Sequence, residues 1–374
     1  MTHKHVAAGT EKGSPRLSDR IAELEDELRN TKYNKRTQHH VGLVKAKLAR
    51  LRERQQARSK PASEGFAVKK SGDATVILVG LPSVGKSTLL NALTNAQSKT
   101  AAYAFTTLSV IPGLLEYKHA KIQVLDVPGI VEGAASGSGR GREVLGVVRS
   151  SDLALLIMDV FHPEQVDVLR KELNNSGVRL DQQRPDVKIM PRPRGGITVS
   201  STARLTMIDE RTIKDVLSEF RLNNADVLIR EDISVDQLID VVEDRCIYMP
   251  SITVVTKIDL VDQKALANAG LIRPDLMVSG EKGTNIGVLK ELIFSRLNLI
   301  RLYCKEIGKK PDLDVPMIMR RNSTIRSMCD RLHRDFAKRF RFARIWGRSA
   351  KFPGQKKGIE HVLADGDIVE IHTR

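Results

Sequence analysis

The sequence predicts an α/β protein of several domains, with a mostly parallel, doubly wound sheet at its centre. Two observations point to this class. Short apolar runs at residues 76–79, 122–125, 153–158 and 251–255 are each followed by glycine or polar residues, which is typical of buried parallel strands. The chain has 374 residues, which exceeds one ordinary hydrophobic core and indicates two to four modules.

The first of these strands runs directly into the most informative segment, residues 80–88. This segment has the GxxxxGK[ST] pattern of a phosphate-binding loop, in which Gly80 and Gly85 let backbone N–H groups turn toward phosphate oxygens. We expect Lys86 to reach the β- and γ-phosphates and Ser87 to ligate Mg²⁺. The helix predicted after the loop would place its positive end under the phosphates. The other predicted contacts in the loop are Pro82, Ser83, Val84 and Thr88.

The strand at 122–125 ends in a second nucleotide-binding segment, residues 126–129. Asp126 is placed to hold the water shell of Mg²⁺, and the amide of Gly129 can bond the γ-phosphate of GTP. Thr106 and Thr107 lie between the two segments, where the first switch of a GTPase is expected. We predict that Thr107 ligates Mg²⁺ in the GTP state only.

The segment Thr256-Lys257-Ile258-Asp259 follows the strand at 251–255 and predicts which base is bound. The Asp259 carboxylate can accept two hydrogen bonds from guanine N1 and N2. Adenine lacks this donor pair, so ATP would leave the carboxylate unpaired. Thr256 stands where Asn is more usual. Ser279 and Gly280 follow another short apolar strand and fit the last base-contacting loop. Four such segments in this order predict a P-loop GTPase core that binds GTP or GDP with Mg²⁺.

Hydrolysis is predicted to be slow. The residue after Gly129 is Ile130, where many small GTPases have a Gln that orients the attacking water. Lys86, Thr107 and Gly129 form the predicted catalytic set. Arg140 and Arg142, in the glycine-rich segment 137–142, could reach the γ-phosphate as an internal arginine finger, or could face solvent or the ribosome. A chain that binds GTP without hydrolysing it is the other alternative.

The charge is concentrated at the two ends of the chain. Residues 1–70 carry 17 Lys and Arg against 8 Asp and Glu, and residues 301–374 carry 18 against 9. Residues 71–300 carry 26 against 28, so the predicted nucleotide domain is nearly neutral. Basic ends of this kind favour contact with a phosphate backbone, although an anionic membrane or an acidic protein would also fit the charge.

A membrane is the weaker alternative. The ends have no large apolar helical face, the run at 153–158 is too short to span a bilayer, and the N-terminus has no apolar signal core. Cys246, Cys304 and Cys329 are isolated, with neither zinc-site spacing nor a disulfide framework. These observations predict a cytoplasmic protein.

Five segments are predicted along the chain. Residues 1–69 form a disordered start and a helical hairpin, which is either a solvated arm or an arm that binds a partner or RNA. Residues 70–175 and 245–297 form the two parts of the nucleotide domain. Residues 176–244 are too many for a loop and predict an inserted small α/β domain, for docking or purely structural. Residues 298–374 complete the chain as a β-grasp domain.

The last segment is predicted from strands at 315–319, 340–346 and 368–372 and from a helix capped by Ser323 or Thr324. The apolar face assigned to that helix runs from Ile325 to Leu332 and Phe336. Basic residues alternate with aromatic ones here. They could bind RNA by phosphate contact and base stacking, but the favoured interpretation is that alternate aromatics fill the core and the basic residues contact phosphate. The aromatic residues are Phe340, Phe342, Trp346 and Phe352.

Taken together, these segments resemble the DRG (developmentally regulated GTP-binding protein) family, in the Obg-related branch of translation-factor-class GTPases. The resemblance covers nearly the whole chain beyond the first fifteen or so residues. It is carried by residues 34–37, 40–51, 80–88, 103–108, 126–134, 256–259, 345–347 and 367–371.

The resemblance implies a helical N-terminal arm, a GTPase core, an insert similar to the second domain of a small-subunit ribosomal protein, and a C-terminal TGS domain. It also implies cytoplasmic GTP hydrolysis linked to ribosomes and translation. The apolar Ile130 resembles the residue at this position in related GTPases that do not use Gln to orient water. Some relatives bind K⁺ through an Asn of the phosphate loop, and this chain has Ser83 at that position.

Two functions are therefore predicted. The first is a slow GTPase switch on the ribosome, with basic ends contacting rRNA or tRNA. The alternative is an RNA-binding or ribosome-associated scaffold in which the nucleotide is mainly structural. Eukaryotic members of the family pair with a stabilising regulatory protein, so we expect such a partner at the N-terminal arm and otherwise a monomer.

Overall fold

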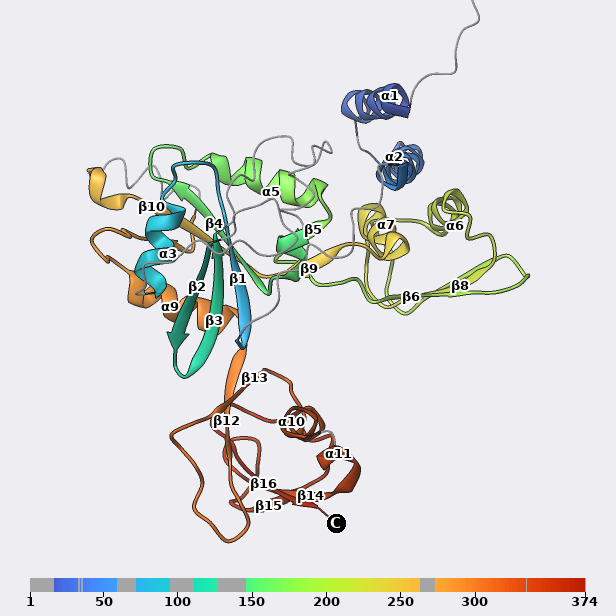
Figure 1. Cartoon of the computed structure of the whole chain (residues 1–374). Helices are drawn as coiled ribbons and strands as arrows, with labels where there is room; N and C mark the ends of the chain where they lie inside the picture. The colour runs from blue at the N-terminus through green and yellow to red at the C-terminus, as the bar shows by residue number, and fades with distance from the viewer. Residues whose placement is uncertain are drawn as a thin grey trace, which may run out of the picture. The chain divides into compact units, whose positions relative to one another are not determined.

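A computed structural model describes residues 17–32, 34, 36–58, 72–94, 111–126, 146–262, 273–333 and 335–373. The chain forms two compact units (Figure 1). One unit combines the two N-terminal helices with residues 183–246, and the other combines residues 72–182 with 247–373, less the gaps given above. The predicted sites at Thr106, Thr107, Gly129, Ile130, Arg140 and Arg142 lie outside the described residues.

The second unit contains a six-stranded sheet in the order β11-β10-β4-β1-β3-β2. All neighbouring strands pair in parallel except β2, which is antiparallel to β3. This confirms the predicted doubly wound sheet. Its strands are β1 (Ala74–Val79), β2 (Ile111–Tyr117), β3 (Ala120–Asp126), β4 (Leu153–Asp159), β10 (Ser251–Thr256) and β11 (Leu276–Met277).

Helices cover both faces of this sheet, which is why its inner strands are apolar at nearly every position. Side chains of β1 alternate between the faces: Val76 and Leu78 pack with α3 and α9, whereas Ile77 and Val79 pack with α5. These helices are α3 (Lys86–Thr94), α5 (Gln165–Asn175) and α9 (Ile286–Arg296), with a short 3₁₀ helix η2 (Ile258–Leu260) after β10. A parallel pair, β5 (Val178–Leu180) and β9 (Ile247–Met249), flanks the point of insertion.

The C-terminal part of the second unit has the predicted β-grasp architecture. Its five strands follow the order β13-β12-β16-β14-β15, and helix α10 packs on one face through Ile325 and Met328. The elements are β12 (Leu299–Cys304), β13 (Met317–Arg320), α10 (Ile325–Leu332), α11 (Phe336–Arg339), β14 (Phe340–Trp346), β15 (Gln355–Lys357) and β16 (Ile368–Thr373).

Two expectations for this domain are wrong. Helix α10 ends at Leu332 because His333 is extended (φ −165°), so Phe336 belongs to α11 and is 39% exposed. Alternate aromatic residues do not fill the core either. Phe340 packs against it, but Phe342 and Trp346 lie on the opposite face of the sheet from the buried Ala343 and Ile345, and Phe352 is 59% exposed.

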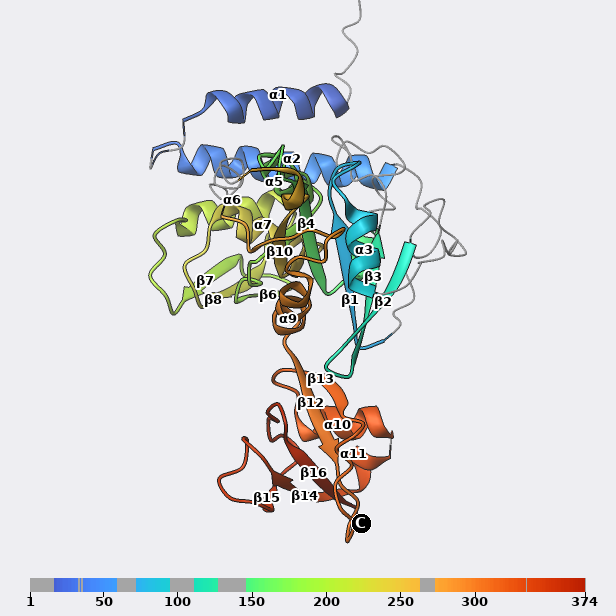
Figure 2. The same cartoon turned by 90° about the vertical axis from the view of Figure 1, so that its left-hand side faces the viewer.

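The first unit joins the N-terminal helices to the insert. Figure 2 shows its layers: α1 lies on α2, α2 lies on α6 and α7, and these cover one face of a sheet. The sheet has the order β6-β8-β7, with β6 antiparallel and β7 parallel to β8. The elements are α1 (Leu17–Asn30), α2 (Gln38–Arg58), β6 (Val187–Pro191), β7 (Ile197–Ser201), α6 (Glu210–Glu219), β8 (Ala225–Ile229) and α7 (Val235–Glu243).

The packing of α2 on the insert had no counterpart in the sequence analysis. Ala46 is fully buried in the core of the insert, and Val41 and Val44 are 5% and 4% exposed, so α2 is not a solvated helix. Gly42 lets α2 come close to the insert, because a Cβ atom there would lie 2.9 Å from Thr212 Cγ2. Ion pairs fix the contact from the side, including Arg50 with Glu219 at 2.9 Å.

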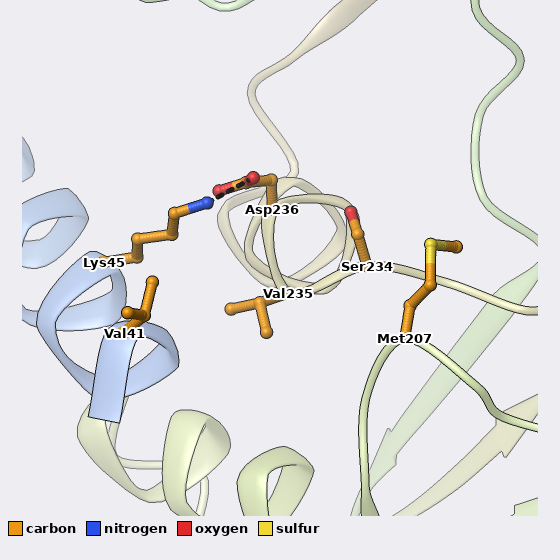
Figure 3. A pocket seen from close by; sticks show the side chains of 6 residues that line it. All are labelled: Val41, Lys45, Met207, Ser234, Val235 and Asp236. Carbon is orange, nitrogen blue, oxygen red and sulfur yellow. Dashed lines mark hydrogen bonds and ion pairs between the residues drawn. The ribbon is translucent and has the colours of Figure 1, made fainter. Parts of the chain in front are cut away.

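A hollow of about 300 Å³ lies between α2 and α7 in this unit (Figure 3). The Lys45 ammonium and the Asp236 carboxylate bridge it at 2.6 Å. Its lining residues are Val41, Lys45, Met207, Ser234, Val235 and Asp236. This lining is mostly apolar, and its two charges pair with each other, so the hollow has no evident chemistry. No helix within the described ranges combines the length and the apolar character needed to cross a membrane.

Candidate nucleotide-binding site

The described part of the predicted site lies at the carboxyl ends of β1, β3, β10 and β11, in the segments that follow these strands. This edge is where open α/β sheets bind ligands, and β1 lies at the point where the chain order reverses. The predicted residues that the structure describes at this edge are Gly80, Pro82, Ser83, Val84, Gly85, Lys86, Ser87, Thr88, Asp126, Thr256, Lys257, Asp259, Ser279 and Gly280.

The phosphate loop is shaped by its two glycines. A Cβ atom on Gly80 would lie 2.4 Å from the carbonyl oxygen of Ile157, so no larger residue fits where β1 passes β4. Gly85 has φ +90°, a conformation that favours glycine. Ser83 also has a positive φ, of +63°. The loop therefore curls back on itself before α3 begins at Lys86.

Lys86 lies inside this curl and is 8% exposed. Its ammonium group donates hydrogen bonds to the carbonyl oxygens of Gly80 at 3.1 Å and Leu81 at 2.9 Å. Burial lowers the pKa of Lys86, and the nearby Asp126 carboxylate opposes this effect. The ammonium is thus held by neutral carbonyls that a phosphate oxygen, being charged, can replace.

Ser87 and Asp126 form the part of the site suited to a metal. The Ser87 hydroxyl donates to Asp126 Oδ2 at 2.7 Å, and Asp126 is 3% exposed. The other carboxylate oxygen, Oδ1, is buried and has no hydrogen-bond partner among the described residues. A hydroxyl and a buried carboxylate with unused acceptor capacity are oxygen ligands that suit Mg²⁺. No group of three or more His, Cys, Asp or Glu suited to a metal occurs in the part of the chain that the structure describes.

Thr256 connects the phosphate loop to the base-recognition segment. It is 3% exposed, and its hydroxyl lies 2.6 Å from the carbonyl oxygen of Val84 and 3.1 Å from that of Met158. One hydroxyl hydrogen can serve only one acceptor at a time, and the shorter contact is the one to the phosphate loop. Threonine, which stands here in place of the more usual Asn, therefore still donates a side-chain hydrogen bond to the phosphate loop.

Asp259 and Ser279 converge from the segments that follow two neighbouring strands, β10 and β11. The Ser279 hydroxyl donates to the Asp259 carboxylate, and this bond lowers the pKa of Asp259 against the opposing effect of burial, with Lys282 adding to it. The carboxylate is therefore ionised at neutral pH and can accept from a base. Gly280 packs against the start of α3, where its Cβ would lie 3.3 Å from Thr88 Cγ2.

Asp159 is a contributor that the sequence analysis missed. It ends β4 and is 8% exposed, and its carboxylate accepts the backbone N–H of His162 at 3.0 Å and lies 3.4 Å from the Lys257 ammonium. It thereby holds Lys257, which directly follows β10, at this edge of the sheet. The available signal was its position: an acidic residue directly after a buried strand, at the same sheet edge as the predicted site.

Comparison with known proteins adds three family matches along the chain. A family described as a 50S ribosome-binding GTPase matches residues 75–190, the C-terminal region of that domain matches residues 194–299, and the TGS domain matches residues 300–373. The successive matches account for the described second unit and for most of the insert.

Full-length relatives are also similar. A GTP-binding protein of Methanocaldococcus jannaschii is 54% identical, over 99% of this chain and 95% of its own. Developmentally-regulated GTP-binding protein 2 of Homo sapiens is 41% identical, over 95% of this chain and 99% of its own. Among solved structures, a GTP-binding protein from Pyrococcus horikoshii OT3 matches 80% of this chain and all of its own at 14% identity, with a TM-score of 0.41.

Proposed function

The chain belongs to the DRG family of GTP-binding proteins, and on this premise we propose that it is a Mg²⁺-dependent GTPase of low intrinsic rate that acts as a switch on the ribosome. GTP binding and GTP hydrolysis in general terms belong to the family. The metal, the rate and the site of action are the proposal.

The observation that carries the metal requirement is the pair of Ser87 and Asp126. The unpartnered, buried Oδ1 of Asp126 lies on a carboxylate whose other oxygen is already bonded to the Ser87 hydroxyl at 2.7 Å. Ser87 would ligate Mg²⁺, and Asp126 would hold its water shell. The bound ion would neutralise charge on the β- and γ-phosphates while Lys86 binds the same oxygens.

The low rate follows from Ile130, which lies next to Gly129 and has no polar group to orient water. Thr107 and Gly129 are proposed to contact the metal and the γ-phosphate in the GTP state. K⁺, an internal arginine at Arg140 or Arg142, or a partner would supply the missing charge stabilisation.

The ribosome is supported by charge and by the description of the matching family. The formal charge is +9 for residues 1–70 and +9 for residues 301–374, against −2 for the residues between them. The family that matches residues 75–190 is described as ribosome-binding. We propose that the basic ends contact rRNA or tRNA in the cytoplasm. The chain would act as a monomer, and its N-terminal arm would bind a regulatory protein.

Co-sedimentation with ribosomes at physiological salt tests this proposal. The chain is mixed with ribosomes in the presence of a non-hydrolysable GTP analogue, GDP, or no nucleotide. Pelleting only with the analogue supports a nucleotide-gated switch. Equal pelleting in all three favours the alternative, a ribosome-associated scaffold in which the nucleotide is structural, and no pelleting contradicts both.

Two variants sharpen the experiment. Ser87→Asn removes the hydroxyl that we assign to Mg²⁺, so it should abolish both turnover and analogue-dependent pelleting. Ser295→Asn makes the same change on α9, in the same domain but away from the phosphate loop, and should behave like the parent chain. GTP turnover that is unchanged by Ser87→Asn or by removal of Mg²⁺ would contradict the metal assignment.

A further inference from the structure

The C-terminal sheet has one face covered by α10 and an opposite face with a different composition. Strand β14 alternates between them: Ala343 and Ile345 are fully buried under α10, whereas Phe342, Arg344 and Trp346 face the other way. We call this second side the open face. Its residues come from β12, β16, β14 and β15, which lie next to one another in the sheet.

A row of charged residues crosses the open face at right angles to the strands. The strand register places Lys356 opposite Arg344, and Arg344 opposite Glu370. Lys305 continues the row from the end of β12, where its ammonium bonds to the Glu370 carboxylate. The row thus holds three cations and one carboxylate, and Lys305 and Arg344 are the direct neighbours of Glu370. Neighbouring strands are about 4.8 Å apart, so the row is roughly 14 Å long.

The carboxylate in this row, Glu370, is buried, and both of its oxygens already accept hydrogen bonds. Glu370 is 5% exposed, and His372 Nε2 lies 2.7 Å from its second oxygen. Burial alone would raise the pKa of Glu370, but the hydrogen bonds from Lys305 and His372 outweigh it and lower that pKa. The exposed members of the row are Arg344 and Lys356, so the face that solvent meets is cationic.

Aromatic rings flank the row on both sides. On one side the rings of Phe342 and His372 are stacked at 4.3 Å with an interplanar angle of 19°, and the Lys356 ammonium lies 4.7 Å from the Phe342 centroid. On the other side the Lys305 ammonium lies 4.9 Å from the Trp346 centroid. Each lysine thus rests on a ring that an incoming planar group could occupy in its place.

We propose that the open face binds single-stranded RNA, whose phosphates pair with Arg344 and Lys356 while bases stack on the rings of Trp346 and Phe342. This inference rests on the RNA contact in the proposed function and goes beyond it by naming the surface and the form of the RNA. Unpaired bases are what a sheet bearing cations and aromatic rings is suited to hold. Duplex RNA keeps its bases stacked, and an acidic peptide has no bases to place on the rings.

Trp346 provides a direct readout, because it is the only tryptophan of the chain. The full chain, with GDP and Mg²⁺ present, is titrated with an unstructured 12-nucleotide RNA while tryptophan fluorescence is recorded. Stacking of a base on Trp346 should quench the fluorescence. The same RNA in a duplex and polyglutamate of equal charge should give little quenching. An unchanged signal with single-stranded RNA, or equal quenching by all three, would overturn the proposal.

Paired charge variants test the surface itself. Arg344→Gln with Lys356→Gln removes two exposed cations from the open face. Lys338→Gln with Arg339→Gln removes two exposed cations from α11, whose Ala337 packs against the opposite side of the sheet. The first pair should weaken RNA binding about tenfold or more and lower the salt slope by about 0.7 per lost phosphate contact, whereas the α11 pair should change little. Equal effects of the two pairs would overturn the proposal. Lys305 is left intact because its loss would leave the buried Glu370 carboxylate without its ion-pair partner.

The two proposals fail separately. A chain that pellets with ribosomes only in the presence of the GTP analogue, but whose Trp346 does not respond to RNA, overturns the open-face assignment and leaves the proposed function standing. A chain that binds single-stranded RNA through the open face but never pellets with ribosomes keeps the assignment and contradicts the ribosomal switch.

Discussion

The Thr256 hydroxyl connects the base-recognition segment to the phosphate loop. It ends β10 directly before the base-recognition segment, and it bonds the carbonyl oxygen of Val84 in the phosphate loop at 2.6 Å. The two segments that would hold opposite ends of a nucleotide are therefore joined by a single buried hydrogen bond. Such a bond has little net effect on stability when made, but its loss leaves a buried carbonyl unsatisfied.

Thr256→Val preserves the shape of the side chain and removes only the hydroxyl. We expect GDP to dissociate about tenfold faster, because an unsatisfied buried acceptor costs about 1–3 kcal/mol and the phosphate loop loses its fixed position. Thr256→Ser keeps the hydroxyl and is the matched control. Release of a fluorescent GDP analogue measures the rate. A rate for Thr256→Val equal to that of Thr256→Ser would show that the hydroxyl does not position the loop.

At the scale of elements, the sequence pattern predicted the features that depend on residues close together in the chain. It missed the features that depend on contacts between distant residues. The strand–loop–helix context around residues 80–88 is local, so the site at the carboxyl ends of the strands was predictable. The strand β12 was not, because Arg301 and Tyr303 interrupt its apolar residues and its partners lie up to 65 residues away, as between Tyr303 and Ile368. The placement of Phe340 and Phe342 on opposite faces was not predictable either, because the ladder between β14 and β16 is irregular between these two residues, which changes the alternation of faces.

The missed strand β12 is fixed to the turn before β16 by a charge-assisted contact. The Asp365 carboxylate accepts from the Arg301 guanidinium at 2.8 and 3.1 Å and from the Arg301 backbone N–H at 2.7 Å. The hydrogen bond from the Arg301 side chain is the main cause that holds the pKa of Asp365 below its ordinary value of 3.8, against the effect of burial. A carboxyl with a lowered folded-state pKa stabilises the fold above its unfolded-state pKa, and this contribution is lost as the pH falls through the folded-state value.

Asp365→Asn should therefore destabilise the C-terminal domain at pH 7 by about 1 kcal/mol, a value discounted because both side chains are about one-third exposed. The difference from the parent chain should shrink as the pH falls below 3.8. Urea unfolding followed by Trp346 fluorescence measures it, since Trp346 lies in β14 of the same domain. Asp314→Asn, at an exposed site in that domain, is the control. A deficit that does not depend on pH would contradict the role of the charge.

The contact of α2 with the insert depends on Gly42. Gly42→Ala gains helix propensity but places a methyl group 2.9 Å from Thr212 Cγ2, and overpacking of this kind costs about 1–3 kcal/mol. Gly287→Ala in α9 makes the same change where nothing lies within 4 Å. We expect thermal unfolding to show Gly287→Ala neutral or stabilising and Gly42→Ala destabilising. Equal stabilisation by both would show that α2 does not pack tightly on α6.

At the scale of the whole molecule, the chain folds into two units, each built from segments that are not adjacent in the sequence. The N-terminal arm and the insert share one hydrophobic core although residues 65–182 lie between them in the sequence, and the nucleotide sheet and the β-grasp domain belong to the other unit. Binary patterning identifies the apolar faces of α2, α6 and α7 one at a time but does not say which face covers which. The pairing depends on shape, at Gly42 above all, and shape is not visible in a pattern of apolar and polar residues.

The division into two compact units predicts two thermal transitions, of which only one responds to nucleotide. GDP with Mg²⁺ at 100 times its Kd should stabilise the unit that contains the phosphate loop by about 2.7 kcal/mol and leave the other transition in place. Gly42→Leu should do the reverse, lowering the transition of the arm–insert unit, because a larger side chain at the same contact cannot be accommodated. Scanning calorimetry with and without GDP measures both. A single transition that moves with either perturbation would show instead that the two units unfold as one, and that the nucleotide stabilises the arm as well as the domain that binds it.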